Sequence, residues 1–490
     1  MSKTTPSFIV EIPLHTSSKE EMVLRKRFWA AKQQYNALLG EGLKRLYKVR
    51  KDPNFLLAQQ LYKEKGKKQE AKEIWETLHK KYGFREYDLY SFCKQWNKKE
   101  NPLRIGARIS QKIAKRVFDA LQKYTLKMRG KPRFKGFRGI NSIEDNSIDA
   151  NLRIKENTLY YLGIAMPLLW NLKDPIHCHG KHSKHKYVRL VRRKFSNKYR
   201  YFAQIICQGK PFQKSKNLIA NNTIGLDIGP STIAIVSPQT QKASLSLFAD
   251  QLKSHTQTKK KLQRKIARKL RAGNPNAFHS DKFQKKDKHW VRKQGTNKKG
   301  IPLKNRSKKL IATTNKLNNI QRKEAAFRKS QHGKIINQIL KQGNHVKTEK
   351  LSYKSFQKNF GKSTGFRAPG IFLEMLRRKA ENTGGKVEEC NTYKTALSQT
   401  CHCGQKGKKK LSQRWHKCNC GVEAQRDLYS AYLANFVEND TLIVDNAQKA
   451  WSGMDIALRT AMSQLKQTSS RPMPASLGLS GSEFVVRNVS

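Results

Sequence analysis

The spacing of hydrophobic residues changes within the first 130 residues of the chain. Residues 7–14 (SFIVEIPL) alternate apolar and polar side chains, which predicts a β-strand. Ser17, with Glu20 three residues later, is typical of a helix start. Small and apolar residues then recur at steps of three and four between cations: Leu24, Phe28, Ala31, Tyr35, Leu38, Gly42 and Leu46, and later Ile109, Ile113, Val117 and Leu121. We therefore expect a basic helical region over residues 17–129.

A β-rich region is predicted after the helical one. It begins at Gly130 with GKPRFKGFRG, in which glycine and proline break the helix among four cations: Lys131, Arg133, Lys135 and Arg138. The runs RIKENTLYYLG, KYVRLVRRKF and RYFAQIICQG then alternate between polar turns, which predicts antiparallel strands and a small barrel. The first strand, in residues 1–16, would pair into this β domain at 130–217, with the helical region inserted between the two parts.

A third region starts with NTIGLDIGPSTIAIVSP, two strand-like runs joined by Gly229-Pro230. Two long basic helices are expected after it, at about 246–271 and 305–341. Residues 272–304 between them have no hydrophobic period and many lysines, so we expect a mobile loop there.

The charge of the chain restricts its partners. The 490 residues contain 101 Lys and Arg against 35 Asp and Glu, a net charge of +66, which indicates a polyanionic partner, with nucleic acid as the first candidate. The longest apolar run, Leu162–Trp170, is interrupted by Pro167 and is shorter than the roughly 18 residues of a membrane span. The N-terminus does not have the pattern of a signal peptide. We expect a protein of the cytosol or nucleoid without a membrane partner.

Two pairs of cysteines have the spacing of a metal site. They form a duplicated C-x-C-G pattern with 14 residues between its halves, and comprise Cys401, Cys403, Cys418 and Cys420. Thiolates suit tetrahedral zinc, and the glycines permit the tight turns that such ligands need. Replacement of one thiol by His402 or His416, or a knuckle that has lost its metal, stays open. The other four cysteines are isolated and are expected to be reduced and structural: Cys93, Cys178, Cys207 and Cys390.

Three carboxylates lie at the ends of predicted elements. Asp227 lies on the face of its strand opposite Ile224, Leu226 and Ile228, although an aspartate before Gly-Pro is by itself most often a turn residue. Glu349 ends the alternating run HVKTE, where a solvated charge is the ordinary interpretation.

The third of these carboxylates, Asp427, opens a helix with an apolar stripe, and a first-turn aspartate is favoured by the helix dipole. Ala431 and Ala434 would let this helix approach a sheet closely.

Other charged runs have less specific interpretations. HCHGKHSKH, at 177–185, suits a polar loop better than a metal site, because carboxylate support is missing. KKKLQRKIARKL, from Lys259, and KGKKK, from Lys406, fit either a solvated surface or a contact with a phosphate backbone.

The strings LDIGPSTIAIV, VKTEKLSYKSF and SQTC-x-CG…C-x-CG…QRDLYSA resemble, in this order, the three split motifs of RuvC-type nucleases. Over about residues 5–436 the chain is similar to the transposon-encoded TnpB proteins and their relatives, the compact type V CRISPR effectors. This resemblance implies an α+β multidomain fold. An RNase H-like (RuvC) nuclease domain would carry a zinc knuckle insertion, and an N-terminal β-barrel (wedge) domain would be interrupted by a helical recognition domain.

The resemblance also implies a division of the chain. The parts are the first wedge strand (1–16), the recognition domain (17–129), the wedge domain (130–217), the RuvC-like domain with motifs I and II and a helical insertion (218–397), the zinc knuckle (398–422), motif III (423–437) and a partly disordered C-terminal tail (438–490).

The family pattern assigns Asp227, Glu349 and Asp427 as catalytic ligands of two Mg²⁺ ions, because phosphodiester hydrolysis uses paired divalent ions held by oxygen. One structural Zn²⁺ would bind the four cysteines, although family members more often have C-x-x-C. Arg426 also has a family counterpart and would orient Asp427 or contact the scissile phosphate, unless it is a surface arginine. The cations from Lys131 to Arg138 would contact nucleic acid.

The implied function is RNA-guided DNA endonuclease activity, with a guide RNA and target double-stranded DNA as partners and a short flanking duplex motif read by the protein. Two alternatives remain: a catalytically silent RNA-guided DNA-binding protein, and a nonspecific RNase H-like nuclease or structural RNA-binding protein. The number of copies on one RNA is left open.

Overall fold

The protein is described by a computed structural model that covers residues 6–64, 66–100, 105–136, 139–145, 147, 150–286, 289–410 and 413–468. The chain divides into two compact units, Met1–Phe212 and Gln213–Ser490. Each unit contains both helices and sheets, so the protein has a mixed α+β multidomain fold. No helix in the described ranges is long and apolar enough to span a membrane.

The first unit contains the predicted helical region. Its helices are α1 (Ser18–Lys51), α2 (Pro53–Leu61), α3 (Lys68–Lys81), α4 (Glu86–Glu100) and α5 (Ala107–Thr125). Helix α1 begins with a capping box in which Ser17 accepts from the backbone N–H of Glu20 and Glu20 accepts from that of Ser17. All the periodic positions predicted from the sequence in α1 and α5 are buried. This confirms the two amphipathic stripes.

Strands of the first unit form two sheets. They are β1 (Ser7–Pro13), β2 (Ser142–Glu144), β3 (Leu152–Lys155), β4 (Thr158–Tyr161), β5 (Ile164–Pro167), β6 (His185–Phe195) and β7 (Lys198–Gln208). One sheet has the order β1-β7-β6-β2 and the other β3-β4-β5. Strand β1 is antiparallel to β7, with Val10 opposite Ile205, so the predicted pairing across the helical insertion is confirmed. A bridge between Leu14 and Leu168 links the two sheets.

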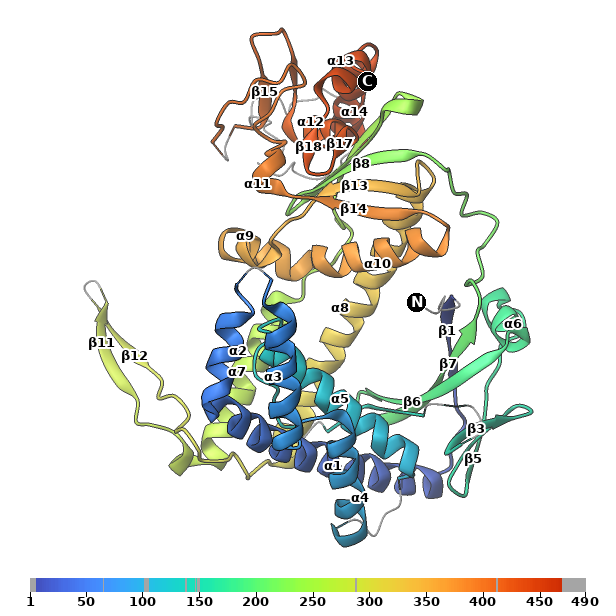
Figure 1. Ribbon diagram of the computed structural model, residues 1–490, viewed down its shortest axis with the longest axis vertical. Helices are drawn as coiled ribbons and strands as arrows, with labels where there is room; N and C mark the ends of the chain where they lie inside the picture. The colour runs from blue at the N-terminus through green and yellow to red at the C-terminus, as the bar shows by residue number, and fades with distance from the viewer. Residues whose placement is uncertain are drawn as a thin grey trace. The chain divides into compact units, whose positions relative to one another are not determined.

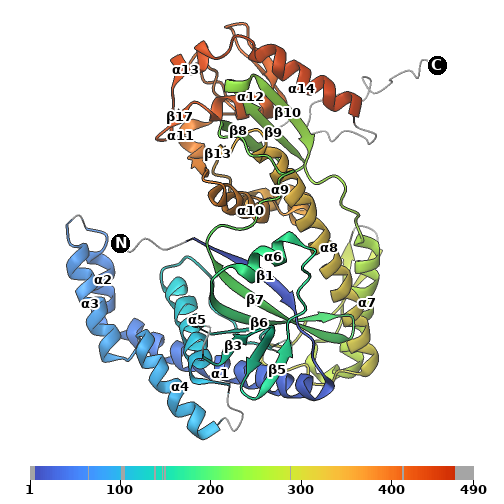
Figure 2. The ribbon, with the colours of Figure 1, turned by 90° about the vertical axis from the view of Figure 1, so that its right-hand side faces the viewer.

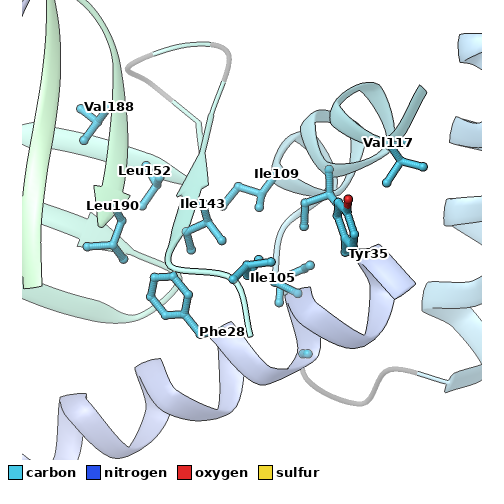
Figure 3. Packing of buried hydrophobic residues seen from close by; sticks show 14 of the residues in the cluster. Phe28, Tyr35, Ile105, Ile109, Val117, Ile143, Leu152, Val188 and Leu190 are labelled. Carbon is cyan, nitrogen blue, oxygen red and sulfur yellow. The ribbon is translucent and has the colours of Figure 1, made fainter. Parts of the chain in front are cut away.

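Helices and strands of the first unit share one hydrophobic core (Figure 3). Phe28 of α1 and Ile109 of α5 point toward Ile143 of β2 and Leu190 of β6 in this view. All four side chains are buried. The helical insertion therefore packs on the strands that precede and follow it in the sequence, because the apolar faces of the helices and of the strands bury one another.

The histidine-rich run does not form the predicted polar loop. Residues Pro175–His182 form helix α6, capped by Asp174, which accepts from the backbone N–H of Ile176. His179 stacks on Phe8 of β1, with ring centroids 5.0 Å apart. The sequence missed this helix because it has two turns and Gly180, which lies against Val10, interrupts its pattern.

A five-stranded mixed sheet forms the centre of the second unit (Figures 1 and 2). Its strands are β8 (Thr223–Ile228), β9 (Thr232–Ser237), β10 (Lys242–Leu247), β13 (His345–Glu349) and β14 (Lys386–Cys390), in the order β10-β9-β8-β13-β14. Strands β8, β9 and β10 are joined antiparallel, and β13 is parallel to both β8 and β14. The two strand-like runs on either side of Gly229-Pro230 are thus confirmed as β8 and β9.

Helices cover both faces of this sheet (Figure 1). The C-terminal part of α8 (Lys308–Leu340) and α10 (Pro369–Asn382) pack on the face that carries Ile224, Leu226 and Val346. On the other face, α12 (Arg426–Ala434) and α14 (Met454–Thr468) pack against Ala234 and Val236 of β9. The sheet is therefore the middle layer of three.

Two predictions for residues 246–304 were wrong. The first long helix, α7 (Thr256–Gly273), starts ten residues later than expected, because residues 242–247 complete β10. The predicted mobile loop contains a short 3₁₀ helix (Pro275–Ala277) and an antiparallel hairpin of β11 (Lys282–Lys286) and β12 (His289–Lys293). Every residue of β12 is exposed, so the hairpin has no buried face to impose an alternating pattern.

The segment after residue 437 is more ordered than the predicted tail. It contains β17 (Val437–Glu438), β18 (Thr441–Leu442), α13 (Val444–Lys449) and α14, whose Leu458 and Met462 are buried against the sheet. The disorder predicted from about residue 468 falls on 469–490, which lie outside the described residues. The remaining elements of this unit are a 3₁₀ helix (Pro238–Thr240), α9 (Tyr353–Arg367), α11 (Thr392–Thr395), β15 (Trp415–Lys417) and β16 (Glu423–Gln425).

Candidate active site and metal centre

Strand register places Asp227 and Glu349 side by side. Leu226 of β8 is paired with Thr348 of the parallel strand β13, and the next residues along these strands are Asp227 and Glu349. Successive side chains of a strand point to opposite faces. Because Leu226 belongs to the core on the α8–α10 face, both carboxylates point to the face that α12 covers.

Helix α12 brings Asp427 to the same face. Its N-cap residue, Gln425, accepts from the backbone N–H of Leu428, and Asp427 follows in the first turn. Thr232 of β9 donates to Oδ2 of Asp427 over 3.2 Å, and the aspartate is only 7% exposed. Strands β8 and β13 and helix α12 therefore place one carboxylate each on a common face of the sheet.

A glycine of β8 permits the close approach of α12. A Cβ atom at Gly225 would lie 1.7 Å from the carbonyl oxygen of Ala431, so any side chain here would push the helix off the strand. Asn435, at the C-cap, also donates to the carbonyl of Val236 in β9 over 3.2 Å. The position of Asp427 thus depends on the small residues that face each other across this contact, as the sequence suggested for Ala431.

We expect Gly225→Ala to lower the free energy of unfolding by about 2 kcal/mol or more, since overpacking against rigid backbone typically costs 1–3 kcal/mol. Gly333→Ala is the matched control, because a Cβ in that part of α8 meets no atom within 4 Å apart from the backbone of its own helix. The control should be neutral or more stable, as alanine favours helices. Urea unfolding of both variants measures this, and equal stabilities would show that α12 is not packed so tightly.

Burial and neighbouring charge perturb two of the carboxylates. Burial raises the pKa of Asp227 well above its usual range, and the charges of Asp427 and Glu349 raise it further. Burial also raises the pKa of Glu349 to about 6, opposed by a hydrogen bond from the backbone N–H of Leu397. Concentrated negative charge of this kind is relieved by a bound cation, and perturbed carboxylates are typical of functional sites.

Glu349 gives a pH dependence that can be measured on protein freed of Mg²⁺ but not of zinc. Its pKa of about 6 in the folded state exceeds the ordinary value of about 4.3, so the folded state binds the proton more tightly. Glu349 should therefore lower the free energy of unfolding by about 2 kcal/mol as the pH rises from about 4 to 6. Denaturant titrations of the protein and of Glu349→Gln should diverge by that amount across the window. Parallel curves would contradict the raised pKa.

Two arginines lie beside the carboxylates. Arg426 Nε is 3.7 Å from Oδ1 of Asp427, and the guanidinium donates to the carbonyl of Gln413 over 3.0 Å. The positive charges of Arg426 and Arg414 lower the pKa of Asp227, opposing its carboxylate neighbours. Arg426 is thus not a surface arginine.

Arg414, which lies between the two cysteine pairs, was not predicted as a site residue from the sequence. The only feature of the sequence that pointed to it was its position just before the strand that leads into the second cysteine pair.

Four thiols form a compact cluster. The Sγ atoms of Cys401, Cys403, Cys418 and Cys420 all lie within 4.8 Å of one another. Cys401 and Cys420 are 3.5 Å apart, and Cys403 and Cys418 are 3.6 Å apart, measured between sulfurs. Tetrahedral zinc with bonds of about 2.3 Å places its sulfur ligands about 3.8 Å apart. The cluster therefore fits zinc.

The one-residue spacers do not prevent this arrangement. Each pair closes in a turn in which the backbone N–H of the following glycine donates to the first cysteine carbonyl over 3.0 Å, at Gly404 and Gly421. Both glycines have positive φ, 86° and 90°, which disfavours other residues. Neither candidate histidine joins the cluster: His402 contacts the hydroxyl of Tyr429 through Nδ1, and His416 stacks on the same ring.

Tyr429 joins the thiol cluster to the carboxylate site. Its hydroxyl lies 3.3 Å from Sγ of Cys401 and accepts from the backbone N–H of His402 over 2.9 Å. The residue is in α12, two positions after Asp427, and is fully buried. The knuckle is thus attached directly to the helix that positions the third carboxylate, which explains why the cysteines end just before it in the sequence.

The donor set of the carboxylate face fits magnesium, a hard cation that takes oxygen ligands. Among the described residues, the cysteines form the only group of three or more ligand side chains with donor atoms all within 4.8 Å, so the three carboxylates are more widely spread. A pair of ions about 3.5–4 Å apart can be held by ligands that do not all meet at one point, so this wider spacing is compatible with two magnesium ions.

The basic segment after Gly130 belongs to the first unit and is attached to α1. Asn36 accepts from the backbone N–H of Lys135 over 2.7 Å and donates to its carbonyl. Lys131 and Arg133 are exposed. Arg138, the fourth candidate contact to nucleic acid, lies outside the described residues.

In the comparison with protein families, residues 370–433 match the model of the Cas12f1-like, TNB domain. Comparison with curated proteins gives no match. Solved structures give 23 matching chains. One is the cryo-EM structure of the Cas12f1-sgRNA-target DNA complex, with a TM-score of 0.39 and 11% identity over 87% of this chain and 98% of the other. Another is the cryo-EM structure of the CRISPR-Cas12f ternary complex, with a TM-score of 0.27 and 14% identity. This match covers 89% of this chain and 99% of the other.

TM-scores this low do not establish a common fold for the whole chain. The family match is local, and it runs from α10 through the four cysteines to α12. The segment that carries the thiol cluster and Asp427 is therefore similar to the Cas12f1-like TNB domain.

Proposed function

We propose that the chain is an RNA-guided DNA endonuclease of the compact type V and TnpB kind, cutting target DNA by Mg²⁺-dependent phosphodiester hydrolysis at one RuvC-like site. The observation that carries the proposal is the placement of Asp227, Glu349 and Asp427 on one face of the sheet from three remote segments. The five-stranded mixed sheet with helices on both faces supports an RNase H-like domain.

The roles of individual side chains follow from their chemistry. Asp227, Glu349 and Asp427 would hold two divalent ions by their oxygens. Bound there, such ions would lower the pKa of water and neutralise charge on the attacking and leaving oxygens. Arg426, with Nε 3.7 Å from Oδ1 of Asp427, would orient that carboxylate or contact the scissile phosphate. The four cysteines would bind one structural zinc, which would fix the start of α12.

Binding of nucleic acid is carried by the positive charge of the whole chain. A net charge of +66 suits a chain that holds a guide RNA and a guide–target duplex by phosphate contacts, which are strong and independent of sequence. Base pairing then selects the target, and the helices and the wedge-like strands of the first unit read a short flanking duplex motif. Exposed Lys131 and Arg133 belong to this backbone-binding surface.

The proposal is tested by expressing the protein with the RNA encoded beside its gene. The RNA that co-purifies is sequenced, and a plasmid that carries a matching target is incubated with the complex and Mg²⁺. We expect cleavage of the matching plasmid only. Guided binding without cleavage in any divalent metal would favour the catalytically silent alternative, and cleavage that ignores the RNA sequence would favour a nonspecific nuclease.

A further inference from the structure

The hairpin of β11 and β12 is a basic ribbon with exposed aromatic rings. Trp290 is 70% exposed and Phe283 is 65% exposed, although large aromatic side chains are usually well buried. Residues 281–293 contain six Lys and Arg against two Asp, a net charge of +4. The family match begins only at residue 370, well after this segment, and the candidate active site does not use the hairpin.

Strand pairing places the two rings on one face. Phe283 is directly opposite Arg292, and Lys285 is directly opposite Trp290. Paired residues share a face, and so do residues two apart, so these four side chains lie together. Phe283 and Trp290 are diagonal neighbours, with Cβ atoms about 7 Å apart, or about two base steps of 3.4 Å.

Contacts between its two strands close the base of the ribbon, which holds the strands in register. Asp281 accepts from Nε of Arg292 over 2.7 Å and from the backbone N–H of Gly295 over 2.7 Å. An antiparallel bridge joins Phe278 and Asn297 below this pair. Isolated hairpins are marginally stable in water, so an exposed ribbon held in this way is expected to gain stability from a bound partner.

The ribbon continues a surface that is already cationic. It follows α7, and Figure 1 shows it extending away from the end of that helix. Helix α7 contains eight cations and no acid: Lys259, Lys260, Lys261, Arg264, Lys265, Arg268, Lys269 and Arg271. Charge complementarity therefore indicates a polyanion as the partner.

We propose that the β11–β12 ribbon binds single-stranded nucleic acid, with the rings of Phe283 and Trp290 stacked on unpaired bases and the neighbouring cations on the phosphates. Unpaired bases expose the π faces on which aromatic side chains stack. A duplex major groove also admits a β-ribbon, but it presents polar base edges that suit hydrogen-bonding side chains rather than rings. The ribbon binds a displaced DNA strand or an unpaired RNA segment by the same chemistry.

The test uses the full-length protein without divalent metal, so that binding is measured apart from cleavage. Fluorescent single strands of about 12 nucleotides, in DNA and RNA forms, and a matched DNA duplex are titrated at several salt concentrations, because the other cations of the chain bind every probe at low salt. Phe283→Ala/Trp290→Ala should bind at least one single-stranded probe about tenfold more weakly, with an unchanged salt slope and unchanged duplex affinity.

Two further variants make the result specific. Phe283→Tyr/Trp290→Tyr keeps the rings and should restore single-strand binding. Val291→Thr, also exposed but on the opposite face, should bind like the unmodified protein. Whichever single-stranded probe, DNA or RNA, loses affinity in the alanine variant shows which kind of strand the ribbon binds. Unchanged single-strand affinity in the alanine variant, an equal loss for duplex, or a change only in oligomeric state would overturn the proposal, whether or not the protein cleaves DNA.

Discussion

Asp227→Asn is expected to abolish guided DNA cleavage while the protein stays folded and binds nucleic acid. The stabilisation that bound ions give a phosphodiester transition state is worth several kcal/mol, and each 1.36 kcal/mol changes the rate tenfold, so the loss should reach about a thousandfold or more. The substitution keeps the size of the side chain and removes one charge. Cleavage rates under single-turnover conditions measure the effect.

The free energy of unfolding of Asp227→Asn should not fall with its cleavage rate. Burial and two neighbouring carboxylates raise the pKa of Asp227, so its charged form is disfavoured in the metal-free protein, and Asn should leave stability unchanged or increase it. Glu388→Gln is the matched control on the same sheet, because Glu388 forms an exposed ion pair with Lys386 that contributes little. Retained cleavage in Asp227→Asn, or lost cleavage in the control, would contradict the assignment of the site.

The second large effect is expected for Cys418→Ser, which should remove the zinc and unfold the knuckle. Structural zinc contributes about 10–16 kcal/mol of apparent binding energy in zinc-finger peptides, and that energy is coupled to folding. Cys418 is only partly buried, so serine replaces it with little loss of packing, and the effect can be assigned to the metal. Because Tyr429 ties the cluster to α12, cleavage should fall together with zinc content.

Zinc per chain, thermal unfolding and limited proteolysis of residues 398–422 measure this change. We expect about one zinc ion per chain in the unmodified protein and almost none in the variant. Cys178→Ser is the control, since this thiol lies in α6, outside the four-thiol cluster. Active protein without zinc, or equal zinc and melting in Cys418→Ser, would exclude a metal-holding knuckle.

Periodic segments could be predicted from the sequence because their faces are buried. The stripe from Leu24 to Leu46 covers a core, and so does the alternation in β1 and β8, which makes the pattern a direct consequence of packing. The β11–β12 hairpin and α6 were missed for the opposite reason: the first buries no face, and the second is too short to show a period.

For the site, the sequence indicated which residues to consider but not their spacing. The acids at 227, 349 and 427 were recognised as a set through a resemblance, and only the strand register and the contact of Gly225 with Ala431 place them on one face. The C-x-C spacing left zinc ligation open, because a sequence does not show how two turns approach each other. Arg414 was missed because its neighbours in space come from elements more than ten residues away.

A structure of the protein with Mn²⁺, located by its anomalous scattering, shows whether the three remote carboxylates share one metal site. We expect one or two ions bound by oxygens of Asp227, Glu349 and Asp427 at about 2.1 Å. Ions bound elsewhere, or carboxylate oxygens more than about 10 Å apart, would contradict a shared metal site.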